Sequence, residues 1–219
     1  MKTGKIVLFD IDNTLFDTTN FRQRLYTTVA QALSSDIDSI NEIGQRVITE
    51  CIGEFGFFDP HVFALRLALE LNRKKDVALI EQAILDKRNF ENGLYEESFG
   101  VVADVSKEAT IGIFSRGYTE FQEKKIVGLR HLLAQEHVHI TINKHETLPS
   151  LIAKYKEKTL YLVDDALDVL YTAWKLRKDV VTIWVKRGKY ALSQEPIPGF
   201  TPSVVITNLK EAVSVIRGI

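Results

Sequence analysis

The sequence predicts an α/β protein with a doubly wound parallel sheet and an inserted helical domain. Short apolar, β-branched runs alternate with helical stretches along most of the chain, which is typical of a parallel sheet covered on both faces. The segment that follows the first run lacks this alternation and is expected to form consecutive helices. We therefore assign residues 18–90 to the inserted helical domain, and residues 1–17 and 91–219 to the core.

The expected core elements are read in chain order. The strand-like runs are Lys5–Phe9, Thr110–Ser115, His137–Ile142, Thr159–Val163, Val180–Val185 and Ser203–Thr207. The helices expected between and after them are Glu120–Ala134, Leu148–Lys156, Ala166–Lys178 and Asn208–Ile216, the last one capped by Asn208.

The inserted segment carries its own helix signals. Ser39 and Glu42 match a capping box. Asp59 before Pro60 predicts an N-cap followed by proline at the first helical position. Apolar residues then recur at helical spacing: Val62, Leu65 and Leu69, and further on Val77, Ile80 and Ile84.

Composition limits the class of protein. A chain of 219 residues with 45% hydrophobic residues can bury a core, and a net charge of −1 gives no reason to expect binding to nucleic acid or membranes. The lone Cys51 excludes an internal disulfide and fits a reducing compartment. No apolar run approaches the ~18 residues of a membrane helix. We expect a cytoplasmic protein, and the sequence leaves its oligomeric state open.

Two acids follow the first strand. In open α/β sheets, ligands bind at the carboxyl ends of the strands, where Asp10 is expected. Asp12 lies two residues further on and can project to the same side. Adjacent carboxylates repel unless a cation or a shared proton intervenes, and a hard cation such as Mg²⁺ prefers carboxylate oxygens. A turn or helix cap is the alternative, but the buried strand before the pair and the hydroxyl of Thr14 favour a functional site.

The second and third strands also end in polar residues. The hydroxyl of Ser115 can donate to a phosphate oxygen, and we predict Ser115, Arg116 and Thr14 as the phosphate-binding residues. Lys144 follows the third strand and can offset phosphate or carboxylate charge. Lys124 and Lys125 are rivals for this role, although their helix is expected to place them on or near its polar side.

Three acids, Asp164, Asp165 and Asp168, follow the fourth strand. They form a credible cation site, although one of them can instead cap the next helix. We predict Asp165 as the main metal ligand and Asp164 as a second, with Asp10 and Asp12 completing the set.

In this combination the sequence resembles the haloacid dehalogenase superfamily of phosphohydrolases. The run from Asp10 to Thr14 looks like the family's Asp-x-Asp-x-Thr motif. Ser115, Lys144 and the pair Asp164-Asp165 match the positions of its three later motifs. The resemblance implies a Rossmann-like core, a helical cap inserted after the first strand and a Mg²⁺ cofactor. It also implies that Asp10 attacks phosphorus, while Asp12 serves as acid and then as base.

The sequence departs from the family pattern in places. Asp164 stands where many members have glycine, Arg116 where many have asparagine, and Lys144 lacks the proline that commonly follows it. The dehalogenase branch usually lacks the second acid of the first motif, so Asp12 favours hydrolysis of a small phosphorylated metabolite.

Other functions stay open at this stage. They are a dehalogenase or phosphomutase of the same superfamily, a receiver-like signalling domain that accepts a phosphoryl group, and a catalytically idle binding module. The sequence does not name a substrate. Residues of the inserted domain that would contact one include Arg22, Arg24 and His61, the last within an aromatic cluster formed by Phe55, Phe57 and Phe58.

Overall fold

The computed structural model describes residues 4–218. Its contacts divide the chain into two compact units. The core unit comprises Met1–Asp17 and Leu94–Ile219, and the helical unit comprises Thr18–Gly93.

The core unit is built on a six-stranded parallel sheet in the order β3-β2-β1-β4-β5-β6. This is the order of a doubly wound, Rossmann-like sheet, so the predicted fold class is confirmed. The order reverses at β1, which pairs with β2 on one side and with β4 on the other. The carboxyl ends of β1 and β4 therefore lie side by side, where such folds bind ligands. The strands are β1 (Lys5–Phe9), β2 (Thr110–Arg116), β3 (Val138–Thr141), β4 (Thr159–Asp164), β5 (Val181–Val185) and β6 (Val204–Ile206).

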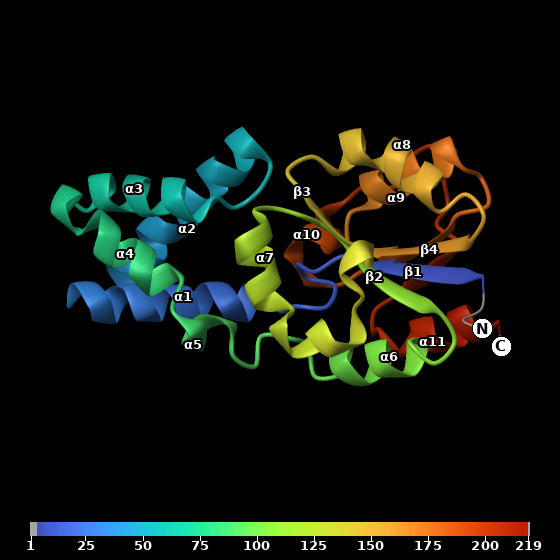
Figure 1. Cartoon of the computed structure of the whole chain (residues 1–219). Coiled ribbons are helices and arrows are strands. Elements are labelled where there is room, and N and C mark those ends of the chain that lie inside the picture. The colour runs from blue at the N-terminus through green and yellow to red at the C-terminus, as the bar shows by residue number, and fades with distance from the viewer. Residues whose placement is uncertain (1–3, 219) are drawn as a thin grey trace. The chain divides into compact units, whose positions relative to one another are not determined.

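Helices cover both faces of this sheet. Figure 1 shows α8 and α9 on one face, and α6 and α11 on the other. Against α8 and α9 the sheet packs alternate residues such as Ile6 and Leu8 of β1, because successive strand side chains point to opposite faces. The core helices are α6 (Ser98–Val105), α7 (Thr119–Lys125), α8 (Lys144–Lys154), α9 (Leu167–Leu176), α10 (Gly188–Ser193) and α11 (Lys210–Arg217), with the short 3₁₀ helices η2 (Val127–Leu132) and η3 (Gln135–His137).

Glycine at position 112 is required by close packing inside the sheet. A Cβ there would lie 2.5 Å from the carbonyl oxygen of His137 and 2.5 Å from the Leu8 side chain. Any larger residue would push the start of β3 away from β2.

Several predicted helix boundaries in the core were wrong. The helix expected over Glu120–Ala134 ends at Lys125, and η2 replaces its second half. Two β-branched residues and a glycine follow there, which lowers helix propensity. The helix expected from Leu148 begins instead at Lys144, because the Asn143 side chain accepts hydrogen bonds from two backbone N–H groups of the first turn.

The cap predicted for the last helix is only partly as expected. Asn208 Oδ1 accepts a hydrogen bond from the backbone N–H of Lys210, where α11 begins. The carboxylate of Glu211 in turn accepts from the backbone N–H groups of Thr207 and Asn208. The start of α11 is therefore fixed by two side chains.

The helical unit contains the segment that lacked strand signals, and between 18 and 90 the described residues form no strand. Asp59 caps α3 with Pro60 at its first position, as predicted. The capping box at Ser39 was wrong, because α2 starts earlier and its cap is Asp36, which accepts a hydrogen bond from the Ser39 backbone N–H. The helices are α1 (Thr18–Leu33), α2 (Ile37–Phe55), α3 (Pro60–Glu70), η1 (Lys74–Asp76), α4 (Val77–Ile84) and α5 (Lys87–Phe90).

The buried face of α3 also differs from the predicted one. Leu65 and Leu69 are exposed, whereas Phe63 and Leu67 are fully buried. Both pairs of residues have helical spacing, and packing against the neighbouring helices buries the pair that includes the larger, aromatic side chain of Phe63.

No helix within residues 4–218 combines the length and apolar character that crossing a bilayer needs.

A buried asparagine holds three helices of this unit together. Asn89 Nδ2 donates to the carbonyls of Ala83 and Ile84 at 2.8 and 3.0 Å, which satisfies the end of α4. Asn89 Oδ1 lies 2.6 Å from the hydroxyl of Thr28 in α1. The side chain is fully buried, so its loss would leave these groups without partners.

We predict that Asn89→Ala lowers the free energy of unfolding by about 2–3 kcal/mol, since buried polar groups lose their partners. Urea unfolding followed by far-UV circular dichroism measures this, because both tryptophans, Trp174 and Trp184, lie in the core unit. Gln82→Ala, which removes an exposed amide from α4, is the matched control and should change stability by less than about 0.5 kcal/mol. Equal effects of the two substitutions would contradict the assigned role.

Candidate active site

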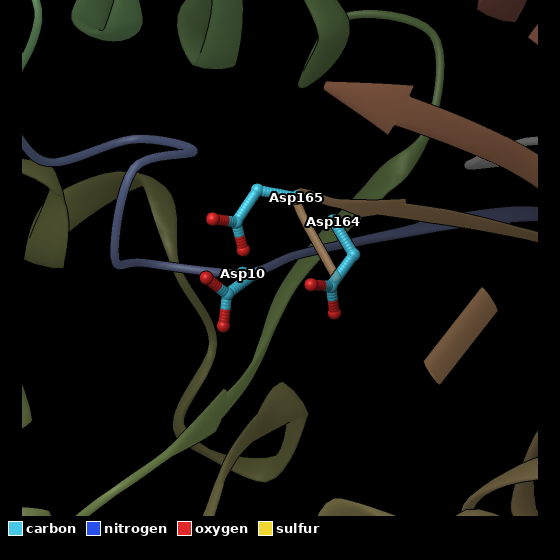
Figure 2. Close-up of side chains that lie close together, drawn as sticks. All are labelled: Asp10, Asp164 and Asp165. Carbon is cyan, nitrogen blue, oxygen red and sulfur yellow. The ribbon is translucent and has the colours of Figure 1, made fainter. Parts of the chain in front are cut away.

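Three carboxylates meet where the strand order reverses. Asp10 follows β1, Asp164 ends β4 and Asp165 comes directly after it. Their exposures are 5%, 1% and 6%, and each offers a carboxylate oxygen within 4.8 Å of the others. Figure 2 shows these side chains lying close together at the ends of the two neighbouring strands. The sheet order thus brings together acids that are more than 150 residues apart in the chain.

Lys144 bridges two of these acids. Its Nζ lies 2.6 Å from Asp10 Oδ1 and 2.7 Å from Asp164 Oδ2, and the side chain is buried. Asn143 caps α8 at this point, so the first helical residue directs its side chain to the end of the sheet. Burial opposes the charge of Lys144, but Asp10 and Asp164 outweigh it and raise the pKa of Lys144 above its ordinary value. The lysine is therefore a fixed cation.

Three acids lie around this one cation, and the pKa values of two of them, Asp164 and Asp165, are raised. Burial raises the pKa of Asp164 to about 6, against the attraction of Lys144. Burial, followed by repulsion from Asp10 and Asp164, raises the pKa of Asp165 well above its ordinary value. Lys144 therefore offsets only part of the effect of burial and of repulsion between the carboxylates.

The donor set fits a divalent cation such as Mg²⁺. The three ligands are hard carboxylate oxygens, and a second positive charge would balance them. Asp164 already uses both oxygens, accepting from Lys144 and from the Ala166 backbone N–H. Asp165 Oδ2 accepts from Asn13 Nδ2 at 3.2 Å, while its Oδ1 has no hydrogen-bond donor among residues 4–218. Asp10 and Asp165 would thus supply the most available oxygens, with Asp164 behind them.

Asp12 lies apart from this cluster and has its own cation. Lys125 Nζ contacts its two oxygens at 2.6 and 2.9 Å, and Gln122 Nε2 donates to Oδ2 at 2.8 Å. The Asp12 side chain is 31% exposed, whereas that of Lys125 is 5% exposed. No carboxylate contact joins Asp12 to the three clustered acids among the described residues, so its predicted role as a metal ligand through its side chain gains no support.

The predicted phosphate-binding residues occupy different environments. The buried Ser115 Oγ accepts from Gln122 Nε2 at 3.0 Å, which leaves its O–H free to donate. Thr14 is fully buried, and its hydroxyl has no partner among the described residues. Arg116 is exposed at the end of β2. Asp168 is outside the cluster and pairs with His145 at 2.9 Å, which separates it from Asp164 and Asp165.

Sequence reasoning missed several residues that hold the site. Asn13, with a φ of 57°, turns the chain after Asp12 and contacts Asp165. Arg187, after β5, donates to the carbonyls of Asn13 and Thr14 and pairs with Glu97. It fixes the loop that carries the first motif, and nothing in its local sequence marks it.

Lys125 was wrongly placed on or near the polar side of its helix. It is 6% exposed, as part of a face formed with Phe121 and Gln122, whereas Lys124 is exposed. The positions of Phe121 and Lys125, four residues apart, could have revealed this, because such residues share one face of a helix.

The three candidates in the helical unit make contacts within that unit. The Arg24 guanidinium donates to the carbonyl of Asn89 at 2.9 Å. His61 is exposed and lies 3.1 Å from Glu81. Arg22 is half-buried, and its charge partly offsets the rise in the pKa of Tyr26 that burial causes. A role in substrate binding stays a prediction for all three.

Comparison with known proteins was informative only at the level of structure. No protein-family model and no curated protein matched the sequence. A protein from Burkholderia xenovorans, named as a haloacid dehalogenase-like hydrolase, matches at 22% identity and a TM-score of 0.79, over 98% of this chain and 96% of that one. YfnB from Bacillus subtilis, named as a HAD-hydrolase and solved bound to magnesium, matches at 16% identity and a TM-score of 0.70, over 99% of both chains.

An enzyme of known chemistry has a similar structure. The L-2-haloacid dehalogenase from Xanthobacter autotrophicus, solved with chloropropionic acid covalently bound, matches at 16% identity and a TM-score of 0.63 over the full length of both chains. The chain therefore has the fold of the haloacid dehalogenase-like hydrolases, with the acid cluster at the end of the sheet where that fold is expected to bind its ligand.

We predict that Mg²⁺ raises the thermal unfolding midpoint. A ligand that binds only the folded protein adds about 2.7 kcal/mol to the free energy of unfolding at a concentration of 100 times its Kd. Differential scanning fluorimetry with and without excess EDTA measures this. Asp165→Asn should greatly reduce the Mg²⁺-induced shift. Asp168→Asn is the matched control and should keep it, since Asp168 lies outside the cluster. Retention of the full shift in Asp165→Asn would contradict the assigned ligand set.

Proposed function

We propose that this protein is a Mg²⁺-dependent phosphoric monoester hydrolase that acts on a small phosphorylated metabolite through an aspartyl-phosphate on Asp10. The observation that carries the proposal is the arrangement around Asp10. This carboxylate lies at the topological switch point, touches the ammonium of Lys144 and is close to two further acids that can hold a cation. Asp12 supplies a separate carboxylate for proton transfer, and it remains partly exposed.

In the first step, a carboxylate oxygen of Asp10 attacks phosphorus. An Asp10–phosphorus bond forms as the bond to the leaving oxygen breaks, and Asp12 gives its proton to that oxygen. Lys144 and the Ser115 hydroxyl are placed to stabilise the charge and orientation of the transferring group. A Mg²⁺ ion held by Asp10, Asp164 and Asp165 would lower the repulsion between the anionic nucleophile and the anionic ester.

In the second step, water attacks the aspartyl-phosphate. Asp12, now a carboxylate, takes a proton from this water as it attacks phosphorus. The bond between Asp10 and phosphorus breaks, inorganic phosphate leaves, and Asp10 and Asp12 return to their starting states. The helical unit is proposed to act as a cap that selects the leaving group.

Dehalogenation is the second candidate, because a matching structure is that of a dehalogenase with covalently bound chloropropionic acid. Asp12 favours the phosphatase, since attack on carbon with loss of halide needs no acid to protonate the leaving group. Chloride release from 2-chloropropionate would test this alternative directly.

A receiver-like domain is disfavoured by the sheet. Receiver domains have the strand order 2-1-3-4-5, in which β1 pairs with β3. Here β1 pairs with β2 and β4, and a helical unit follows β1. A receiver should also show almost no turnover of phosphate esters.

The proposal predicts that the protein hydrolyses p-nitrophenyl phosphate with Mg²⁺ and loses this activity in EDTA. The reason is that four carboxylates share two lysine ammonium groups at this site, so the anionic ester needs further positive charge in order to approach Asp10. Release of p-nitrophenolate measures the rate, and restoring excess Mg²⁺ controls for damage by the chelator. Full activity after complete metal removal would count against the proposal.

A second prediction separates the two acids of the first motif. Asp10→Asn should abolish turnover and form no covalent adduct, because an amide is a poor nucleophile. Asp12→Asn keeps the nucleophile but loses the proton carrier, at a cost of ~10²–10⁴ in rate. With p-nitrophenyl phosphate, Asp12→Asn should accumulate phosphate on Asp10, visible by mass spectrometry of the peptide that contains it. Substantial turnover by Asp10→Asn would require another nucleophile or direct attack by water.

A further inference from the structure

The Asp12 carboxylate is held on one side by two residues of α7. Lys125 Nζ reaches both of its oxygens, at 2.6 and 2.9 Å, and Gln122 Nε2 reaches Oδ2 at 2.8 Å. We propose that Lys125, together with Gln122, is a positioning residue that fixes the Asp12 carboxylate for proton transfer to the leaving group. This inference rests on the proposed phosphatase function and deepens it.

The surroundings of Lys125 direct its ammonium towards Asp12. Its side chain is 5% exposed, and its Nζ lies 4.9 Å from the ring centre of Phe121 and 5.6 Å from that of Phe16. A buried ammonium needs a partner because desolvation disfavours the charge, and aromatic ring faces supply only part of the compensation. In the free protein Asp12 supplies the negative charge and stays in contact with Lys125, and when the anionic ester binds it takes up the proton that it later transfers.

The two side chains of this ion pair differ in solvent exposure. Asp12 keeps 31% of its side-chain surface exposed, while Lys125 lies behind it. The carboxylate is therefore restrained by α7 and keeps solvent-exposed surface that a substrate oxygen or a water molecule can reach.

Gln122 connects this pair to the predicted phosphate-binding strand end. Besides Asp12, its Nε2 lies 3.0 Å from Ser115 Oγ and 2.8 Å from the carbonyl oxygen of Arg116. The two N–H groups of this amide are shared among the three acceptors, so Gln122 links the proposed proton carrier to the proposed phosphate-binding serine. The positive φ of Gly117, 141°, turns the chain between β2 and α7 so that Gln122 can reach back to all three acceptors.

The position of the Asp12 carboxylate matters most for the rate when the leaving group is a strong base. Asp12 transfers its proton to the leaving oxygen while the bond between that oxygen and phosphorus breaks. Phenolate is a stronger base than p-nitrophenolate, so phenyl phosphate depends more on this transfer. A misplaced carboxylate should therefore slow phenyl phosphate far more than p-nitrophenyl phosphate, whereas general damage to the fold should slow both equally.

The test compares kcat/KM for these two esters, because this constant reports steps up to the departure of the leaving group. Lys125→Met removes the ammonium and keeps an unbranched apolar chain, and Lys124→Met is the matched control on the exposed neighbour. We expect Lys125→Met to lose about 10–100-fold with phenyl phosphate and less than about 5-fold with p-nitrophenyl phosphate. KM should change little, and Lys124→Met should behave as wild type with both esters.

Gln122→Leu is the second variant, in case Lys125→Met does not fold as judged by circular dichroism. It removes a donor to the same Asp12 oxygen and should show the same bias towards loss with phenyl phosphate. Equal losses with both esters in a folded variant would overturn the positioning role. A wild-type protein that hydrolyses neither ester with Mg²⁺ would instead refute the proposed function, and this inference with it.

Discussion

The ammonium group of Lys144 lies between the carboxylates of Asp10 and Asp164, and the candidate site depends on this contact. It joins the ends of β1 and β4 to the first residue of α8. All three side chains are buried. Without the lysine, the two carboxylates would repel each other where little water is present to screen their charges. The cap at Asn143 starts α8 at the lysine, and the sheet order brings the two strands together.

The site carries more negative charge than the protein itself balances. Burial is the largest cause of the raised pKa values of Asp164 and Asp165, and repulsion between neighbouring carboxylates adds to it. Functional sites commonly retain such groups although they lower stability, because the same imbalance draws in a cation. Of the three acids, Asp165 accepts a hydrogen bond from a neutral amide, that of Asn13, whereas Asp10 and Asp164 both contact the ammonium of Lys144.

The polar contacts around the first motif divide its acids into two environments. Asp10 faces Lys144 and the acid cluster, while Asp12 faces Lys125 and Gln122. Arg187 and Asn13 hold the turn that directly follows Asp12, although the two acids lie only two positions apart in the chain. A nucleophile and a proton carrier need such separate environments, because one must stay charged while the other exchanges a proton.

The sequence alone determined the strands, the sheet class and the set of polar residues at the strand ends, because these follow from local periodicity and from the rule that ligands lie at carboxyl ends. It also indicated the helical segment and the cap at Asp59. Only the tertiary structure decided which acids lie close together: Asp10, Asp164 and Asp165 form one cluster, whereas Asp168 pairs with His145 and Asp12 with Lys125. It also selected the buried face of α3 and placed Arg187 behind the first motif. These outcomes depend on contacts between residues far apart in the chain, and no local pattern of residues encodes such contacts.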